Sequence, residues 1–86
     1  MHTVELLDQA ITAAKLLGVK FREDWLGGAG GGVCEIKGQR WVFLDLSQGP
    51  ADHLDLVVEA IRGDVGLLQL DLPPQLESMV QLRLSA

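Results

Sequence analysis

The sequence predicts an α+β fold, in which helices pack on a three-stranded antiparallel meander and residues 1–86 form a single domain. Two periodicities and one glycine run carry this prediction. Apolar residues recur at helical spacing in residues 4–17 and 50–62, and they alternate with a period of two in residues 33–46. The glycine run, residues 27–32, separates this alternating stretch from an earlier one. The predicted order is helix, three strands and helix (αβββα), followed by a possible short strand and a C-terminal helix.

The first helix is predicted over residues 4–17. Its apolar side chains fall on one side at spacings of three and four: Val4, Leu7, Ile11 and Ala14. We expect Thr3 to cap the N-terminus, because a hydroxyl can accept a hydrogen bond from a free backbone N–H. Gly18 stands where a left-handed residue would end the helix.

The first strand is predicted at residues 19–26, where Val19, Phe21 and Trp25 share one face. The glycine run that follows suits neither a helix nor a central strand, because glycine loses much conformational freedom when it is ordered. We therefore predict a flexible loop there, with the glycines Gly27, Gly28, Gly30, Gly31 and Gly32.

Residues 33–37 and 40–46 are predicted to form a hairpin around a Gly38-Gln39 turn. This turn would pair Val33 with Leu44 across the two strands. One face of the hairpin is wholly apolar, and we expect it to form the core: Cys34, Ile36, Trp41 and Phe43. The other face is apolar with a charged rim: Val33, Val42, Leu44 and Leu46, with Glu35, Lys37 and Arg40.

A second helix is predicted over residues 50–62. Pro50 suits the first helical position, and Asp52 lies in the first turn, where the helix dipole favours negative charge. The buried stripe would be Leu54, Val57, Val58 and Ile61. Residues 67–72 alternate and allow a short edge strand, and a last helix is predicted over residues 74–84.

The composition argues against several classes of partner. The chain has 12 acidic and 7 basic residues, a formal charge of -5, so we expect neither nucleic acid nor an anionic membrane surface as a partner. No apolar stretch approaches the roughly 20 residues that span a bilayer, and the N-terminus does not resemble a signal peptide. The single cysteine indicates a reducing compartment, so we expect a cytoplasmic protein.

The sequence offers one candidate catalytic pair, Cys34 with His53, oriented by Asp52 or Asp55. The alternation instead places Cys34 on the apolar face, where a thiol usually behaves as a small buried hydrophobe. We therefore predict no catalytic residue and a Cys34 thiol that resists reagents in the native protein.

Cofactor and metal sites are not expected. The glycine run lacks the G-x-G-x-x-G pattern, because Val33 stands at the last glycine position counted from Gly28, and it leads into a strand. The nitrogen and sulfur candidates for a metal lack ligand spacing, and the acidic row on the second helix reads as a solvated face: Asp52, Asp55 and Glu59.

The predicted third strand bears most directly on function. Residues 41–44 are apolar on both faces, which is typical of a strand covered on both sides. Either residues 74–84 or another chain would cover the second face. In the latter case the interface would consist of Val33, Val42, Leu44, Leu46 and Arg40.

Two resemblances bear on this chain. The element order over residues 4–62 resembles the double-stranded RNA-binding domain, but residues 50–55 are acidic where that family is basic, so RNA binding does not follow. Residues 30–46 resemble a stretch in short bacterial proteins of unknown function, which implies a bacterial, cytoplasmic protein.

These observations predict a small, non-enzymatic interaction domain that self-associates as a homodimer or binds another protein. The alternative is a small enzyme or ligand-binding protein that uses the Gly27–Gly32 loop with Cys34 and His53.

Overall fold

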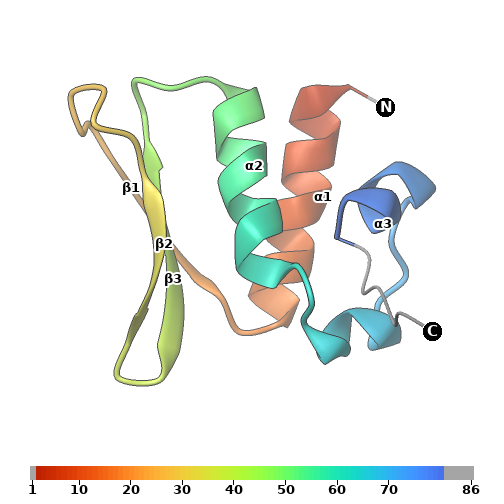
Figure 1. Cartoon of the computed structure of the whole chain (residues 1–86). Coiled ribbons are helices and arrows are strands. Elements are labelled where there is room, and N and C mark those ends of the chain that lie inside the picture. Colours follow the sequence, from red (N-terminus) through yellow and green to blue (C-terminus); the bar gives the residue numbers. More distant parts are fainter. Residues whose placement is uncertain (1, 81–86) are drawn as a thin grey trace.

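The computed structural model describes residues 2–80. Its elements are α1 (Thr3–Leu16), β1 (Lys20–Asp24), β2 (Gly32–Ile36), β3 (Gln39–Asp45), α2 (Pro50–Ile61), a 3-10 helix η1 (Val65–Gln69) and α3 (Pro74–Val80). The sheet forms one layer, and α1 and α2 form a second layer on one of its faces (Figure 1). The α3 helix packs on α1 and α2 on the side away from the sheet (Figure 1). The predicted α+β class and αβββα order are confirmed.

The sheet is mixed, so the prediction of a purely antiparallel meander is wrong. Its strand order is β1-β3-β2: β2 runs antiparallel to β3, and β1 runs parallel to β3. The arrangement follows the composition of the strands. The strand with the longest continuous apolar run, β3, takes the central position, and the charged β1 lies at an edge, where charges are tolerated and discourage indiscriminate pairing.

The hairpin turns one residue earlier than predicted. Its turn residues are Lys37 and Gly38, with φ of 51° and 78°, the pair of positive angles that a type I′ turn requires. Val33 consequently pairs with Val42 rather than with Leu44. A register change of two positions keeps the predicted groups of side chains together on one face or the other, because side chains alternate with a period of two.

The two faces of the hairpin are assigned the wrong way round by the sequence. Val42 and Leu44 are 0% and 2% exposed beneath the helices, whereas Cys34 and Ile36 are exposed on the opposite face. The charged rim of the buried face, which made that face the weaker core candidate, lies near the hairpin turn. There the Arg40 side chain reaches the C-terminal ends of α1 and α2. The cover is α2 of the same chain, with α1 beside it, and not residues 74–84. Of those, residues 81–84 lie outside the described part.

The core lies between the sheet and the two long helices. Small residues on α1 let it pack closely against α2: Ala10, Ala13 and Ala14. The predicted stripe of α2 is buried throughout: Leu54, Val57, Val58 and Ile61.

The helix ends match the sequence in part. Gly18 has a φ of 86°, and the Val19 N–H donates to the Ala14 carbonyl at 2.9 Å, so the predicted C-terminal cap is confirmed. The N-cap is His2 rather than Thr3, and it makes no side-chain capping bond. None of the helices formed by residues 2–80 has the length and apolar character needed to cross a membrane.

Residues 65–69 form the 3-10 helix η1, and residues 70–72 do not form a strand. Asp64 begins η1 by accepting a hydrogen bond from the Gly66 N–H at 2.8 Å. This local cap takes precedence over the alternation that allowed a short strand.

Candidate functional site

The structure encloses most of the interface predicted from sequence. Val42 and Leu44 lie in the core, Val33 is half-buried, and Leu46 is partly exposed just after β3. The prediction that these residues form a free apolar surface therefore names the wrong side of the sheet. The fifth residue, Arg40, has a structural role within the chain.

The apolar surface left open lies on the opposite side, which we call the outer face of the sheet. Its apolar part is Cys34, Ile36, Trp41 and Phe43, and β1 adds Lys20, Arg22 and Asp24. The helices of residues 2–80 all lie on the other side of the sheet (Figure 1). Ile36 is 47% exposed, and Trp41 and Phe43 are half-buried. The sequence identified these side chains as a group but assigned them to the core.

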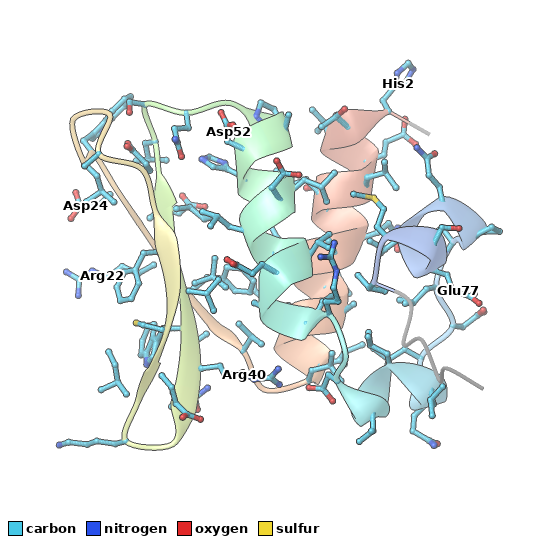
Figure 2. All side chains as sticks on the ribbon, viewed as in Figure 1. His2, Arg22, Asp24, Arg40, Asp52 and Glu77 are labelled. Carbon is cyan, nitrogen blue, oxygen red and sulfur yellow. The ribbon has the colours of Figure 1, made fainter. Side chains whose placement is uncertain are left out.

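Charge on the outer face is arranged beside the aromatic rings. The Trp41 and Phe43 rings are stacked with centroids 6.1 Å apart. Lys20 is paired with Trp41 in the sheet, and its Nζ lies 5.9 Å from the Trp41 ring centroid, within cation–π range. Arg22 and Asp24 point away from the helices (Figure 2). The outer face is therefore amphipathic, with both signs of charge along its β1 side.

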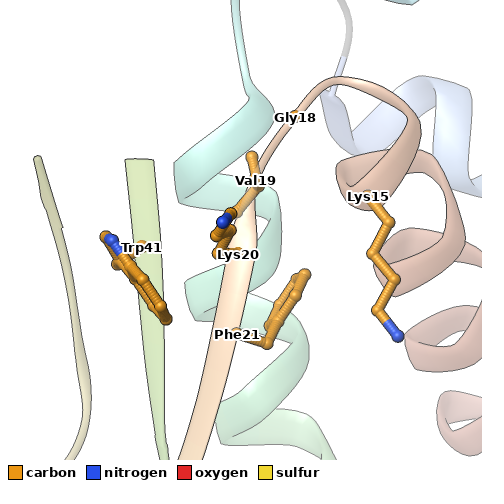
Figure 3. Close-up of a pocket in the computed structure, with 6 residues that line it drawn as sticks. All are labelled: Lys15, Gly18, Val19, Lys20, Phe21 and Trp41. Carbon is orange, nitrogen blue, oxygen red and sulfur yellow. The ribbon is translucent and has the colours of Figure 1, made fainter. Parts of the chain in front are cut away.

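A pocket of about 480 Å³ lies beside the start of β1. It is lined by Lys15, Gly18, Val19, Lys20, Phe21 and Trp41. Lys15 comes from α1, and Phe21 and Trp41 lie on opposite sides of the β1 backbone (Figure 3). The lining has two lysines and no carboxylate, so this part of the strand edge favours an anionic group. Sequence analysis missed the pocket because its residues come from three different elements.

The glycine loop is anchored by Asp45, a fully buried residue that sequence analysis did not single out. Its carboxylate accepts hydrogen bonds from the Leu26 and Gly30 N–H groups at 3.2 and 3.1 Å. It also accepts from the Ser47 hydroxyl at 2.6 Å and the Ser47 N–H at 2.9 Å. The Ser47 hydroxyl is the main reason that the pKa of Asp45 falls to about 2. The signal in the sequence was an aspartate at an alternating position of an otherwise apolar strand face.

Gly31 of this loop is required by packing. A Cβ atom at Gly31 would stand 1.8 Å from the Phe43 carbonyl oxygen, far inside van der Waals contact. The end of the loop therefore lies directly against the β3 backbone at Phe43, an approach that a larger residue would prevent.

The candidate catalytic pair is not assembled. Cys34 is exposed on the outer face, so the prediction of a buried thiol is wrong. His53 lies on α2, on the other side of the sheet, and its Nε2 is 2.7 Å from the Asp45 carbonyl oxygen. Asp52 (Figure 2) is the residue before His53 in α2, and adjacent residues of a helix do not face each other, so Asp52 is poorly placed to orient the imidazole. Within the described part of the chain, no group of three or more metal-ligating side chains comes together.

Arg40, predicted at the interface, holds two helix ends together. Its guanidinium donates to the Ala60 carbonyl at 3.0 Å and the Leu17 carbonyl at 3.1 Å. It also forms a salt bridge of 2.6 Å with Asp64. The cation therefore satisfies free carbonyls at the C-terminal ends of α1 and α2, where the helix dipoles favour positive charge.

Comparisons of the chain with protein-family models, with curated proteins and with solved structures give no match.

Proposed function

We propose that the chain is a small, non-enzymatic interaction domain that self-associates, and that the sheet side of the molecule makes the contacts. The observation that carries the proposal is the outer face, where a central strand presents Trp41 and Phe43 with no helix of residues 2–80 over them. A sheet face turned to water normally carries polar residues. Aromatic side chains placed there are typical of protein contact surfaces.

The charges agree with a protein partner better than with nucleic acid. Both signs lie next to the apolar centre of the outer face, and the whole chain has a formal charge of -5. Phosphate backbones favour surfaces with clustered positive charge alone. A reducing, cytoplasmic compartment belongs to the proposal, because an exposed thiol such as Cys34 is kept reduced there.

The alternative of a small enzyme or ligand-binding protein has less support. Cys34 and His53 lie on opposite sides of the sheet. The Gly30 N–H of the glycine loop is bonded to the Asp45 carboxylate, and the small pocket of about 200 Å³ beside Gly30 and Gly31 is lined by neither Cys34 nor His53. An activity that needs both side chains would require a large rearrangement of the core.

Light scattering over a concentration series tests self-association. We expect the molar mass to rise from 9.3 kDa toward twice that value as the concentration increases. A mass that stays at 9.3 kDa up to millimolar concentration would show that the proposal is wrong.

Substitution of exposed apolar residues outside the sheet tests whether the contact between the copies lies on the sheet side. Val65 and Leu68 of η1 are 74% and 67% exposed and lie on the helix side of the molecule (Figure 1). We expect Val65→Ser and Leu68→Ser to leave the mass profile unchanged. Loss of association in either variant would move the contact from the sheet to η1.

A further inference from the structure

The free edge of β1 has a defined set of unused backbone groups. Asp24 directs its carbonyl toward β3, because that oxygen accepts a hydrogen bond from the Leu46 N–H at 2.9 Å. Alternate residues of a strand direct their backbone groups to opposite edges, so Phe21 and Glu23 direct theirs outward. Among residues 2–80, β1 pairs with β3 alone, which leaves this outward edge free for another strand.

The charges of β1 are ordered along the strand. Lys20 and Arg22 lie in its first half, and Glu23 and Asp24 end it. A second copy of the strand that runs in the opposite direction would therefore bring its acidic end to the basic end of the first. This order makes the edge complementary to itself, as a two-fold symmetric interface requires.

We propose that two copies of the chain join their β1 edges in antiparallel register, with Arg22 opposite Arg22 of the second copy. This inference rests on the proposed self-association and places the contact between the copies at the β1 edge, so the outer faces of both copies remain open beside it. Phe21 then faces Glu23 of the second copy in a hydrogen-bonded pair, and Glu23 faces Phe21 in the symmetric pair. Each Phe21 N–H donates to a Glu23 carbonyl, and each Glu23 N–H donates to a Phe21 carbonyl. The result is one continuous six-stranded sheet.

The lysine-lined pocket receives the acidic end of the second copy. In this register Asp24 of the second copy lies directly opposite Lys20 on the outer face. Glu23 of the second copy lies opposite Phe21 on the helix-covered side, where Lys15 of α1 lines the same pocket. The two carboxylates therefore enter a pocket with a lysine on either side of the strand. By symmetry the contact occurs twice.

Neighbouring registers are less favourable. A register centred on Phe21 places Lys20 opposite Arg22 twice, and like charges that are directly opposite destabilise a strand pair. A register centred on Glu23 has one like-charge pair and two Arg22–Asp24 pairs, the same charge balance as the register centred on Arg22. It pairs only three residues of β1, however, whereas the register centred on Arg22 pairs all five.

Charge exchange within β1 tests this register. Lys20→Glu places two carboxylates opposite each other at two symmetric positions, and Asp24→Lys places two ammonium groups there. We expect each single variant to raise the dimer dissociation constant by roughly tenfold or more, because each alters two cross-strand pairs. The double variant Lys20→Glu with Asp24→Lys has the net charge of the natural chain, and we expect it to recover association to within about threefold of the natural chain.

Matched controls lie away from β1. Lys37→Glu, in the turn between β2 and β3, and Glu77→Lys, on α3, make the same two charge changes at exposed positions. We expect neither to change the dissociation constant by more than about twofold, since exposed charges far from a contact contribute little. If the controls weaken association as much as the β1 variants do, net charge rather than pairing governs it and the register is wrong.

Hydrogen exchange on the natural chain tests the edge pairing without any substitution. Backbone amide hydrogen exchange is compared at concentrations well below and well above the dissociation constant. We expect the Phe21 and Glu23 amides to gain protection at high concentration, because both N–H groups become hydrogen-bonded between the copies. The Glu35 amide, in the strand at the opposite edge, should exchange at one rate throughout.

The outcomes separate this inference from the proposal on which it rests. A dimer whose Phe21 and Glu23 amides exchange at the same rate at all concentrations overturns edge pairing and leaves self-association standing. The same holds if Ile36→Ser abolishes the dimer while the charge variants do not, since the copies would then stack through their outer faces. A strict monomer overturns both.

Discussion

The carboxylate of Asp64 holds the Arg40 guanidinium at 2.6 Å, and that guanidinium in turn binds carbonyls at the ends of two helices. The salt bridge therefore connects β3, α1, α2 and the start of η1 through one cation. The Gly66 N–H bond and Arg40 both lower the pKa of Asp64, while burial opposes them. The charged pair thus links the sheet to the C-terminal ends of α1 and α2.

Removing the cation should destabilise the fold. We expect Arg40→Ala to lower the free energy of unfolding by about 1.5–3 kcal/mol, because hydrogen bonds to a charged group are lost and partly buried carbonyls remain unpaired. Urea unfolding followed by tryptophan fluorescence measures this. Arg62→Ala is the control, since Arg62 is exposed and, among residues 2–80, its side chain donates a single long bond of 3.4 Å to the Met79 carbonyl. Its effect should stay within about 0.5 kcal/mol.

Asp45 should make stability depend on pH in the acid range. Its pKa is lowered from 3.8 to about 2 in the folded chain, mainly by the Ser47 hydroxyl, so the folded state favours the ionised carboxylate. This contribution is complete above about pH 4 and is lost as the pH falls through 4 toward 2. Urea midpoints measured between pH 2 and 5 should therefore fall with decreasing pH.

The variant Asp45→Asn isolates that contribution. An amide presents an NH₂ group to a site with four hydrogen-bond donors, so the variant should be less stable at pH 7. Its midpoint should also vary less with pH between 2 and 4 than that of the natural chain. If the urea midpoints of the two proteins fall equally steeply with decreasing pH, other carboxylates such as Asp64 cause the acid sensitivity.

Alanine substitution at two adjacent glycines should lower the free energy of unfolding by different amounts. We expect Gly31→Ala to cost about 2 kcal/mol or more, because its Cβ would stand 1.8 Å from the Phe43 carbonyl oxygen and the backbone must shift. Gly32→Ala meets nothing within 4 Å, so its cost should stay under about 1 kcal/mol. Thermal unfolding of the two variants at low concentration makes the comparison. Similar losses would show that the loop is not constrained at Gly31.

Cys34 should react readily with a thiol reagent in the native protein. Its side chain is exposed on the outer face, so we expect a rate within about tenfold of that for the urea-unfolded chain. The measurement is made at low protein concentration with a chromogenic disulfide. Strong native protection under those conditions would mean that something covers the outer face around β2.

The sequence revealed the elements whose signals are local. The stripe of α2 and the Gly18 cap depend on residues within one or two turns, so periodicity and a single glycine were sufficient to predict them. Strand partners depend on residues far apart in the chain. The residues from Asp24 to Val42 hold no signal that places β1 parallel to β3, and a meander is the simplest arrangement of three consecutive strands.

The candidate site was harder to predict than the fold. The alternation sorted Val42 and Trp41 onto opposite faces correctly, but it did not say which face the helices would cover. That choice depends on packing between elements, including the use of Arg40 at the helix ends. The pocket beside β1 was invisible for the same reason, since Lys15 and Trp41 meet only in the folded chain.

The parallel pairing of β1 with β3 has a consequence for the order of folding. The β2–β3 hairpin closes across a two-residue turn, whereas β1 has no strand to join until β3 is in place. Closing the longer segment costs more entropy and is slower. The N-terminal strand should therefore dock last during refolding, and pulsed hydrogen exchange should label its amides after those of the hairpin are already protected.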